Sequence, residues 1–145
     1  MKYNIVYLFF ILILIASCQS DKHSTLISKY LKENYSICTK HQDISILIFK
    51  ESGCYSCNTK LEVYLDTVHD FKFDYLILAS KYPQKLENKY REKFESKLLI
   101  DKTDQLSRMN IGFHGSGKII VKYGKLTKVE QYVPTQDSIT FFMVD

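Results

Sequence analysis

Apolar and polar positions alternate along this chain with two different spacings, and each spacing predicts one kind of secondary structure. Ile44 to Phe49 is an almost continuous apolar run rich in β-branched residues, which is typical of a strand buried on both faces. Ser24 to Tyr35 and the stretch that begins at Cys54 instead carry apolar residues three or four positions apart, the spacing of an amphipathic helix. Glu51 to Gly53 therefore separates a strand from a helix.

The same alternation of strands and helices continues through the middle of the chain. Two further apolar runs predict strands, and two stretches with helical spacing predict helices, the second of them capped by Thr103. The strands are expected at Phe73 to Leu78 and Lys97 to Ile100, and the helices at Lys85 to Phe94 and Thr103 to Met109.

The last part of the chain changes character. Lys118 to Tyr123 and Leu126 to Val133 flank Gly124, which predicts a β-hairpin with the glycine at its turn. We also expect a short final helix that Thr135 or Asp137 would cap. The predicted fold class is α/β, with a central mixed β-sheet flanked by helices and a C-terminal hairpin.

The N-terminal segment is apolar but too short to be a comfortable membrane span. Ile5 to Ile15 falls well below the roughly 20 residues of a transmembrane helix, which indicates a secretory signal. The segment ends Leu14-Ile15-Ala16-Ser17-Cys18 and resembles the lipobox of bacterial lipoproteins, in which a cysteine receives lipid and becomes the mature N-terminus. A plain signal peptide followed by an accidental cysteine is the alternative.

This resemblance divides the chain into three parts. Residues 1–17 would be a lipoprotein signal peptide, residues 18–42 a lipid-anchored tether with an N-terminal helix, and residues 43–145 the folded domain. Several acyl chains on Cys18 would hold the protein at a membrane surface, since each buried methylene contributes about 0.8 kcal/mol.

Composition and charge exclude several classes of protein. The chain has 145 residues, 46% of them hydrophobic and 25% charged, which fits one globular domain and neither a disordered nor a multi-span membrane protein. The formal charge of +4 is spread among interleaved acids and bases, so we expect no nucleic-acid binding. No phosphate-binding glycine loop, paired catalytic carboxylates or Ser/His/Asp arrangement is found in the sequence. We expect no cofactor.

The spacing Cys54-x-x-Cys57 at the start of a predicted helix carries the clearest chemistry. Both cysteines would lie on one helix face, and the positive end of the helix dipole beside the first one favours its thiolate. The first sulfur would then be the nucleophile and the second would resolve a mixed disulfide. Outside the cytoplasm these two cysteines can bond to each other, which leaves Cys38 over.

With these features the sequence resembles the thioredoxin superfamily, in particular the envelope thiol-disulfide oxidoreductases of the TlpA and ResA type. The resemblance covers about residues 43–133 and implies a thioredoxin-like fold in which Cys54 attacks and Cys57 resolves. It also implies protein thiols or disulfides of the bacterial cell envelope as partners, at a membrane-anchored, extracytoplasmic, periplasmic location. The resembling segments are the strand ending at Phe49, Cys54-Tyr55-Ser56-Cys57, and residues 74–80, 98–104 and 119–125.

Three departures from the family pattern accompany this resemblance. Ser116 or a neighbour stands where the family keeps a cis-proline facing the disulfide, and a non-proline cis bond costs about 2.5–4 kcal/mol, so we expect a trans peptide there. Ile48 stands where thioredoxins often carry a buried acid, and Gly53 replaces a common tryptophan. The departures would alter the exchange rate and the substrate groove.

Two other interpretations of the cysteines stay open at this point. Cys54 and Cys57 would form a structural disulfide in a non-catalytic lipoprotein, or they would bind a metal ion. The metal set would be Cys38-x-x-His41 with Cys54-x-x-Cys57, which has zinc-ribbon spacing, or the two cysteines with His114, which suits copper.

Overall fold

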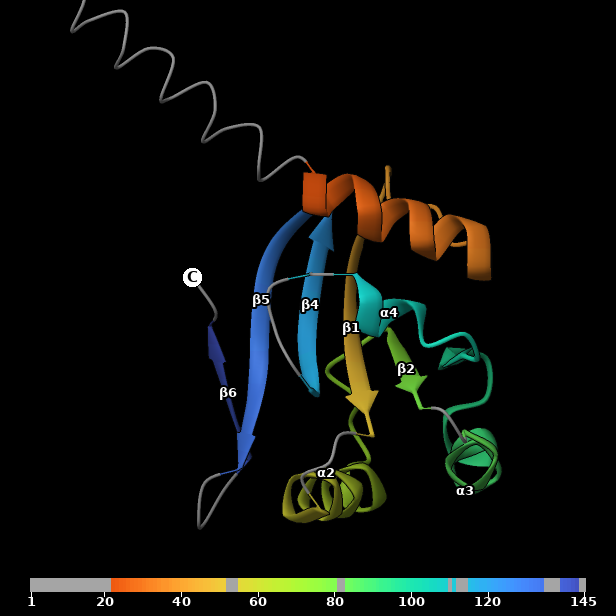
Figure 1. Cartoon of the computed structure of the whole chain (residues 1–145), viewed down its shortest axis with the longest axis vertical. Coiled ribbons are helices and arrows are strands. Elements are labelled where there is room, and N and C mark those ends of the chain that lie inside the picture. Colours follow the sequence, from red (N-terminus) through yellow and green to blue (C-terminus); the bar gives the residue numbers. More distant parts are fainter. Residues whose placement is uncertain are drawn as a thin grey trace, which may run out of the picture.

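The computed structural model describes residues 22–51, 55–80, 83–109, 111, 115–134 and 139–143. Within this part of the chain, six strands form one sheet in the order β3-β2-β1-β4-β5-β6 (Figure 1). The strands are β1 (Asp43–Lys50), β2 (Tyr75–Ala79), β3 (Leu98–Asp101), β4 (Gly117–Lys122), β5 (Lys125–Pro134) and β6 (Ile139–Met143). The helices are residues 22–35, α2 (Tyr55–Thr67), α3 (Gln84–Phe94) and α4 (Gln105–Arg108), with a 3₁₀ turn, η1, at Glu95–Lys97.

The sheet is mixed, as the sequence predicted. β1 pairs in parallel with β2, and β2 pairs in parallel with β3, while β4, β5 and β6 extend the sheet on the other side by antiparallel pairing. β1 therefore lies inside the sheet and has a hydrogen-bonded neighbour along both edges.

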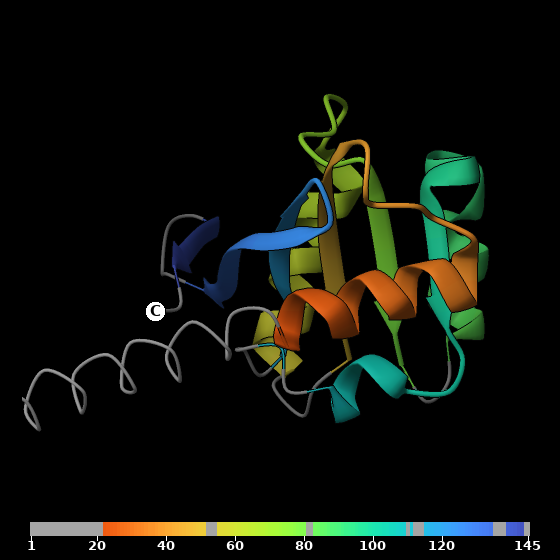
Figure 2. The same ribbon diagram turned by 90° about the horizontal axis from the view of Figure 1, so that it is seen from above.

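Helices cover both faces of the sheet. Alternate residues of β1 point to opposite sides: Ile46 and Ile48 join a core with helix 22–35 and α4, while Leu47 and Phe49 join a second core with α2 and α3. Figure 2 shows helix 22–35 and α4 on the same side of the strands. The prediction of a strand buried on both faces is confirmed.

The predicted hairpin is present, and its turn lies at Tyr123 and Gly124. Both residues have positive φ angles, 48° and 79°, and Lys122 pairs with Lys125 across the turn. Two successive residues with positive φ are the requirement of a type I′ turn, which matches the twist of the two strands. Gly124 supplies one of these conformations without steric strain.

The predicted final helix is wrong, because residues 139–143 form strand β6. β6 pairs antiparallel with β5, with Tyr132 opposite Phe141 and Pro134 opposite Ile139. β5 would otherwise expose a row of unpaired backbone groups, and the β-branched and aromatic residues of β6 suit a strand. The cap residues proposed for the helix, Thr135 and Asp137, lie outside the described residues.

The predicted cap of α4 is also wrong. The buried carboxylate of Asp101 accepts hydrogen bonds from the backbone N–H groups of Gln105, at 3.1 Å, and Leu106, at 2.8 Å. Thr103 donates its hydroxyl to the same carboxylate at 3.3 Å instead of capping the helix itself. Asp101 has this role because β3 ends directly below the first turn of α4, so its carboxylate reaches the free amides.

Candidate functional site

The cysteine motif stands at the junction of β1 and α2. β1 ends at Lys50, α2 begins at Tyr55, and Cys57 is the third residue of the helix. Cys54 and the side chain of Cys57 lie outside the described residues. The predicted change from strand to helix at the motif is confirmed, and it occurs at the carboxyl end of β1 and its parallel neighbour β2, where open α/β sheets commonly bind their ligands.

The helix that carries the motif has a favourable electrostatic arrangement for an anion. α2 has 13 residues and no acidic residue in its first turn. The backbone N–H groups at the start of a helix have no partner within the helix and mark the positive end of its dipole. No carboxylate of that turn opposes this positive end, so the position of Cys54, directly before Tyr55, suits a thiolate.

Ser116 holds the end of β1 from which the motif departs. Its hydroxyl accepts a hydrogen bond from the Lys50 N–H at 2.9 Å and donates one to the Lys50 carbonyl at 3.2 Å. The last backbone pair of β1 and β4 is Ile48 with Gly117, so this side chain continues the pairing beyond the ladder. Among the described residues no peptide bond is cis, and the expectation of a trans peptide at Ser116 is confirmed.

A second contact ties the chain after β1 to the end of β2. The Glu51 N–H donates to the Ala79 carbonyl at 3.2 Å, and the buried Ser80 hydroxyl donates to the Glu51 carboxylate. The carboxylate three positions before Cys54 is thus engaged with the end of β2. The end of β1 is therefore held on one side by Ser116, directly before β4, and on the other side by the end of β2.

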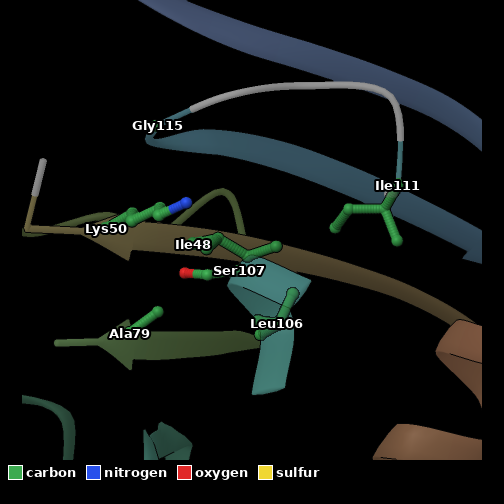
Figure 3. A pocket seen from close by; sticks show the side chains of 7 residues that line it. All are labelled: Ile48, Lys50, Ala79, Leu106, Ser107, Ile111 and Gly115. Carbon is green, nitrogen blue, oxygen red and sulfur yellow. The ribbon is translucent and has the colours of Figure 1, made fainter. Parts of the chain in front are cut away.

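A small pocket lies at the same end of β1, on the face covered by helix 22–35 and α4 (Figure 3). Ile48, Ala79, Leu106 and Ile111 give it the apolar part of its lining. The polar contributions come from Lys50, Ser107 and the backbone at Gly115. The pocket has room for little more than a water-sized group beside the strand that leads to Cys54.

The four-ligand zinc set with Cys38 and His41 is wrong. Both residues precede β1, whereas Cys57 follows it, and a strand of eight residues spans about 25 Å. Zinc ligands must all lie within about 2.3 Å of one ion, so the two pairs do not share a site. Cys38 is an exposed free cysteine, and within the described ranges no group of three potential ligands is close enough to hold a metal ion.

The remaining residues singled out in the sequence either lie outside the described residues or pack in the core. Cys18, Gly53 and His114 lie outside the described residues. Ile48 is buried, with 2% of its surface exposed, and packs in the core with helix 22–35.

In the sequence, Ser116 stands out only as a residue in or beside the position of the family's cis-proline. Its contact with Lys50 cannot be predicted there, since the two residues are 66 positions apart and no local pattern connects them.

The comparisons with known proteins give no relative for this chain. No family model matches it, and no curated protein or solved structure matches it. Among the helices in the described ranges, none has both the length and the apolar character needed to cross a bilayer.

Proposed function

We propose that the chain is a lipid-anchored, thioredoxin-like thiol-disulfide oxidoreductase of the bacterial cell envelope, with Cys54 and Cys57 as its redox pair. The observation that carries this proposal is the position of the motif, where the central strand β1 passes into α2. A structural disulfide needs no such position, whereas a reactive thiolate benefits from the start of a helix.

The arrangement of the sheet supports the thioredoxin-like assignment. The segments that resemble the family become β1, β2, β3 and the β4–β5 hairpin, in one mixed sheet with helices on both faces. Ser116, which itself or through a neighbour would take the family's cis-proline position, contacts the strand end that leads to the cysteines. The proposal therefore includes a site built from the motif and the Ser116 loop.

The proposed reaction transfers two electrons from a dithiol to a disulfide. The Cys54 thiolate attacks one sulfur of a partner disulfide, which forms a mixed disulfide and releases the other partner sulfur as a thiolate. The Cys57 thiolate then attacks the Cys54 sulfur, which forms the Cys54–Cys57 disulfide and releases the second partner thiolate. The partner is reduced and the motif is oxidised; the reverse sequence oxidises a partner dithiol.

The proposed anchor is a lipid on Cys18. Helix 22–35 already includes Lys22 and His23, so three residues of the sequence, 19–21, lie between the proposed anchor and the described helix. The helix therefore begins before Ser24, where the sequence predicted its start.

Trapping of a mixed disulfide tests the proposed reaction. The exposed thiol of Cys38 would compete in any such assay, so we would use the full mature protein with Cys38→Ser as the background. Adding Cys57→Ser should leave a mixed disulfide between Cys54 and a partner or a model disulfide, while adding Cys54→Ser should abolish trapping. The Cys38→Ser protein should titrate as a two-electron couple against glutathione or dithiothreitol.

The outcomes separate this proposal from the two other interpretations. No exchange with a model disulfide and no trapped species would refute the redox function and favour a structural disulfide. Stoichiometric zinc or copper on the reduced protein, lost on oxidation of the pair, would favour metal binding.

A further inference from the structure

We infer that one end of the domain lies against the membrane: the turn surface, formed by Lys22, Lys40, Lys122, Tyr123 and Lys125, contacts an anionic lipid surface. The inference rests on the lipid anchor of the proposed function and adds an orientation to it. It concerns the end of the sheet opposite the cysteine motif.

The length of the tether brings this end close to the bilayer. Lys22 stands four positions after Cys18, and an extended chain covers at most about 3.5 Å per residue, so the start of the helix lies within about 14 Å of the anchored cysteine. Such a short connection leaves the nearby surface of the domain within reach of the lipid headgroups.

The hairpin turn packs against the start of this helix. The Ser28 hydroxyl donates to the Gly124 carbonyl at 3.0 Å, and the Ser24 hydroxyl accepts from the Leu126 N–H at 3.0 Å. The Thr39 hydroxyl donates to Ser28, and the Tyr123 N–H donates to the Gln42 carbonyl. The turn, the loop before β1 and the first turns of the helix therefore form one surface at the anchored end (Figure 1).

The chemistry of this surface fits anionic lipid. Tyr123 is 70% exposed, the most exposed large apolar or aromatic side chain among the described residues. The four lysines are also exposed. Tyrosine is favoured at the headgroup level of a bilayer, and lysines beside a membrane anchor are attracted to anionic lipids.

Among the described residues, one acidic group faces this surface at close range. The Asp43 carboxylate lies 3.9 Å from the Lys122 ammonium and offsets part of its charge. Lys22, Lys40 and Lys125 have no ion pair with a described residue, so their charges are available to lipid phosphates. Counted over its described residues, the surface keeps a positive excess.

The inference determines on which side of the domain, relative to the membrane, the proposed redox motif lies. Asp43, at the start of β1, pairs with Lys122 beside the turn, while Lys50 ends the strand at the motif. A strand of eight residues separates the two ends by about 25 Å. With the turn surface on the bilayer, the motif faces away from the membrane, toward proteins of the envelope.

The absence of tryptophan from the sequence allows a single-reporter experiment. Tyr123→Trp would place one tryptophan in the turn surface of the full lipidated protein. Lys102→Trp is the matched control, because Lys102 is exposed and follows β3 at the motif end of the sheet. Both proteins would be reconstituted in vesicles of phosphatidylcholine with an equal amount of phosphatidylglycerol, with and without brominated lipid.

We expect a blue-shifted emission and strong bromine quenching for the Tyr123→Trp protein, and neither change for the Lys102→Trp protein. Equal quenching of the two proteins would overturn the inference and leave the redox proposal intact. An unquenched reporter at position 123, in a protein whose Cys18 carries lipid by mass spectrometry, would do the same. A Cys18 without lipid would overturn the anchor and this inference together, while the trapping experiment would still decide the redox function.

A charge variant tests the contribution of the lysines. In the Tyr123→Trp protein, Lys40→Gln with Lys125→Gln should reduce the quenching on the anionic vesicles toward its value on pure phosphatidylcholine. Lys85→Gln with Lys102→Gln removes the same charge from exposed positions at the other end and should leave the quenching unchanged. Equal effects of the two pairs would overturn the assignment of the turn surface as the lipid contact.

Discussion

Ser116 connects the candidate site to the rest of the sheet, and its replacement by alanine tests this connection directly. The hydroxyl makes two hydrogen bonds with the backbone of Lys50, at 2.9 Å and 3.2 Å, and the residue is only 8% exposed. Ser116→Ala removes both bonds and leaves the Lys50 N–H without this partner. The backbone bond from the Tyr132 N–H to the Ser116 carbonyl stays available in the variant.

The expected loss follows from these contacts. A neutral hydrogen bond contributes about 1 kcal/mol to the free energy of unfolding, so two bonds correspond to about 2 kcal/mol. Since Lys50 is only half-buried, water can replace part of this interaction, and we expect a loss of about 1–2 kcal/mol. For a domain of this size, that loss lowers the Tm by about 4–8 °C.

Urea unfolding and amide hydrogen exchange would measure this effect. The Lys50 amide should lose protection in Ser116→Ala more than the other amides of β1 do, because the bond it makes is removed. Ser116→Thr keeps a hydroxyl and should be closer to wild type. Ser45→Ala is the matched control in β1, since its hydroxyl makes only a long bond of 3.4 Å to the Lys72 carbonyl. Equal stability of Ser116→Ala and Ser45→Ala would refute the role of Ser116.

Three further predictions concern the frame around the site. Asp101→Ala should lower the free energy of unfolding by about 3 kcal/mol in urea, and Asp101→Asn by less, because an amide oxygen still accepts from the start of α4; equal losses would contradict the cap. Gly124→Ala should lower the free energy of unfolding in urea by about 1–2 kcal/mol. The loss comes from the φ of 79° alone, since an added Cβ would meet nothing nearer than 3.8 Å. An unchanged urea midpoint would contradict this turn. Burial raises the pKa of Tyr35 from 10.0 to about 12, so the stabilisation by its neutral hydroxyl should be complete below pH 10 and be lost as the pH rises toward 12. The free energy of unfolding, measured against pH, should fall less steeply over this range in Tyr35→Phe than in the wild type. An equal slope in the two proteins would contradict the prediction.

Several features of this protein could be predicted from the sequence because they depend on neighbours along the chain. The apolar run of β1, the change of spacing after Gly53 and the glycine of the hairpin turn are local patterns. The position of the cysteine motif at a strand-to-helix junction follows from the same patterns. Backbone geometry over a few residues determines each of these features.

Other features depended on contacts between distant parts of the chain. The short apolar segment 139–143 has no decisive spacing, and the free edge of β5 decided that it is a strand. Asp101 caps α4 in place of Thr103, because its buried carboxylate, at the end of β3, lies next to the start of the helix. A five-residue run or a single cap residue has too little local preference to resist such contacts.

The sequence by itself determined which residues carry the candidate chemistry, and the tertiary structure decided which of them can act together. Cys38 and His41 have ligand spacing, yet an extended strand of eight residues keeps them from Cys57. Ser116 and Lys50 are 66 positions apart, yet antiparallel pairing of β1 with β4 brings them into contact. Spacing along a chain sets distances only within one element, whereas the pairing of strands sets the distances between elements.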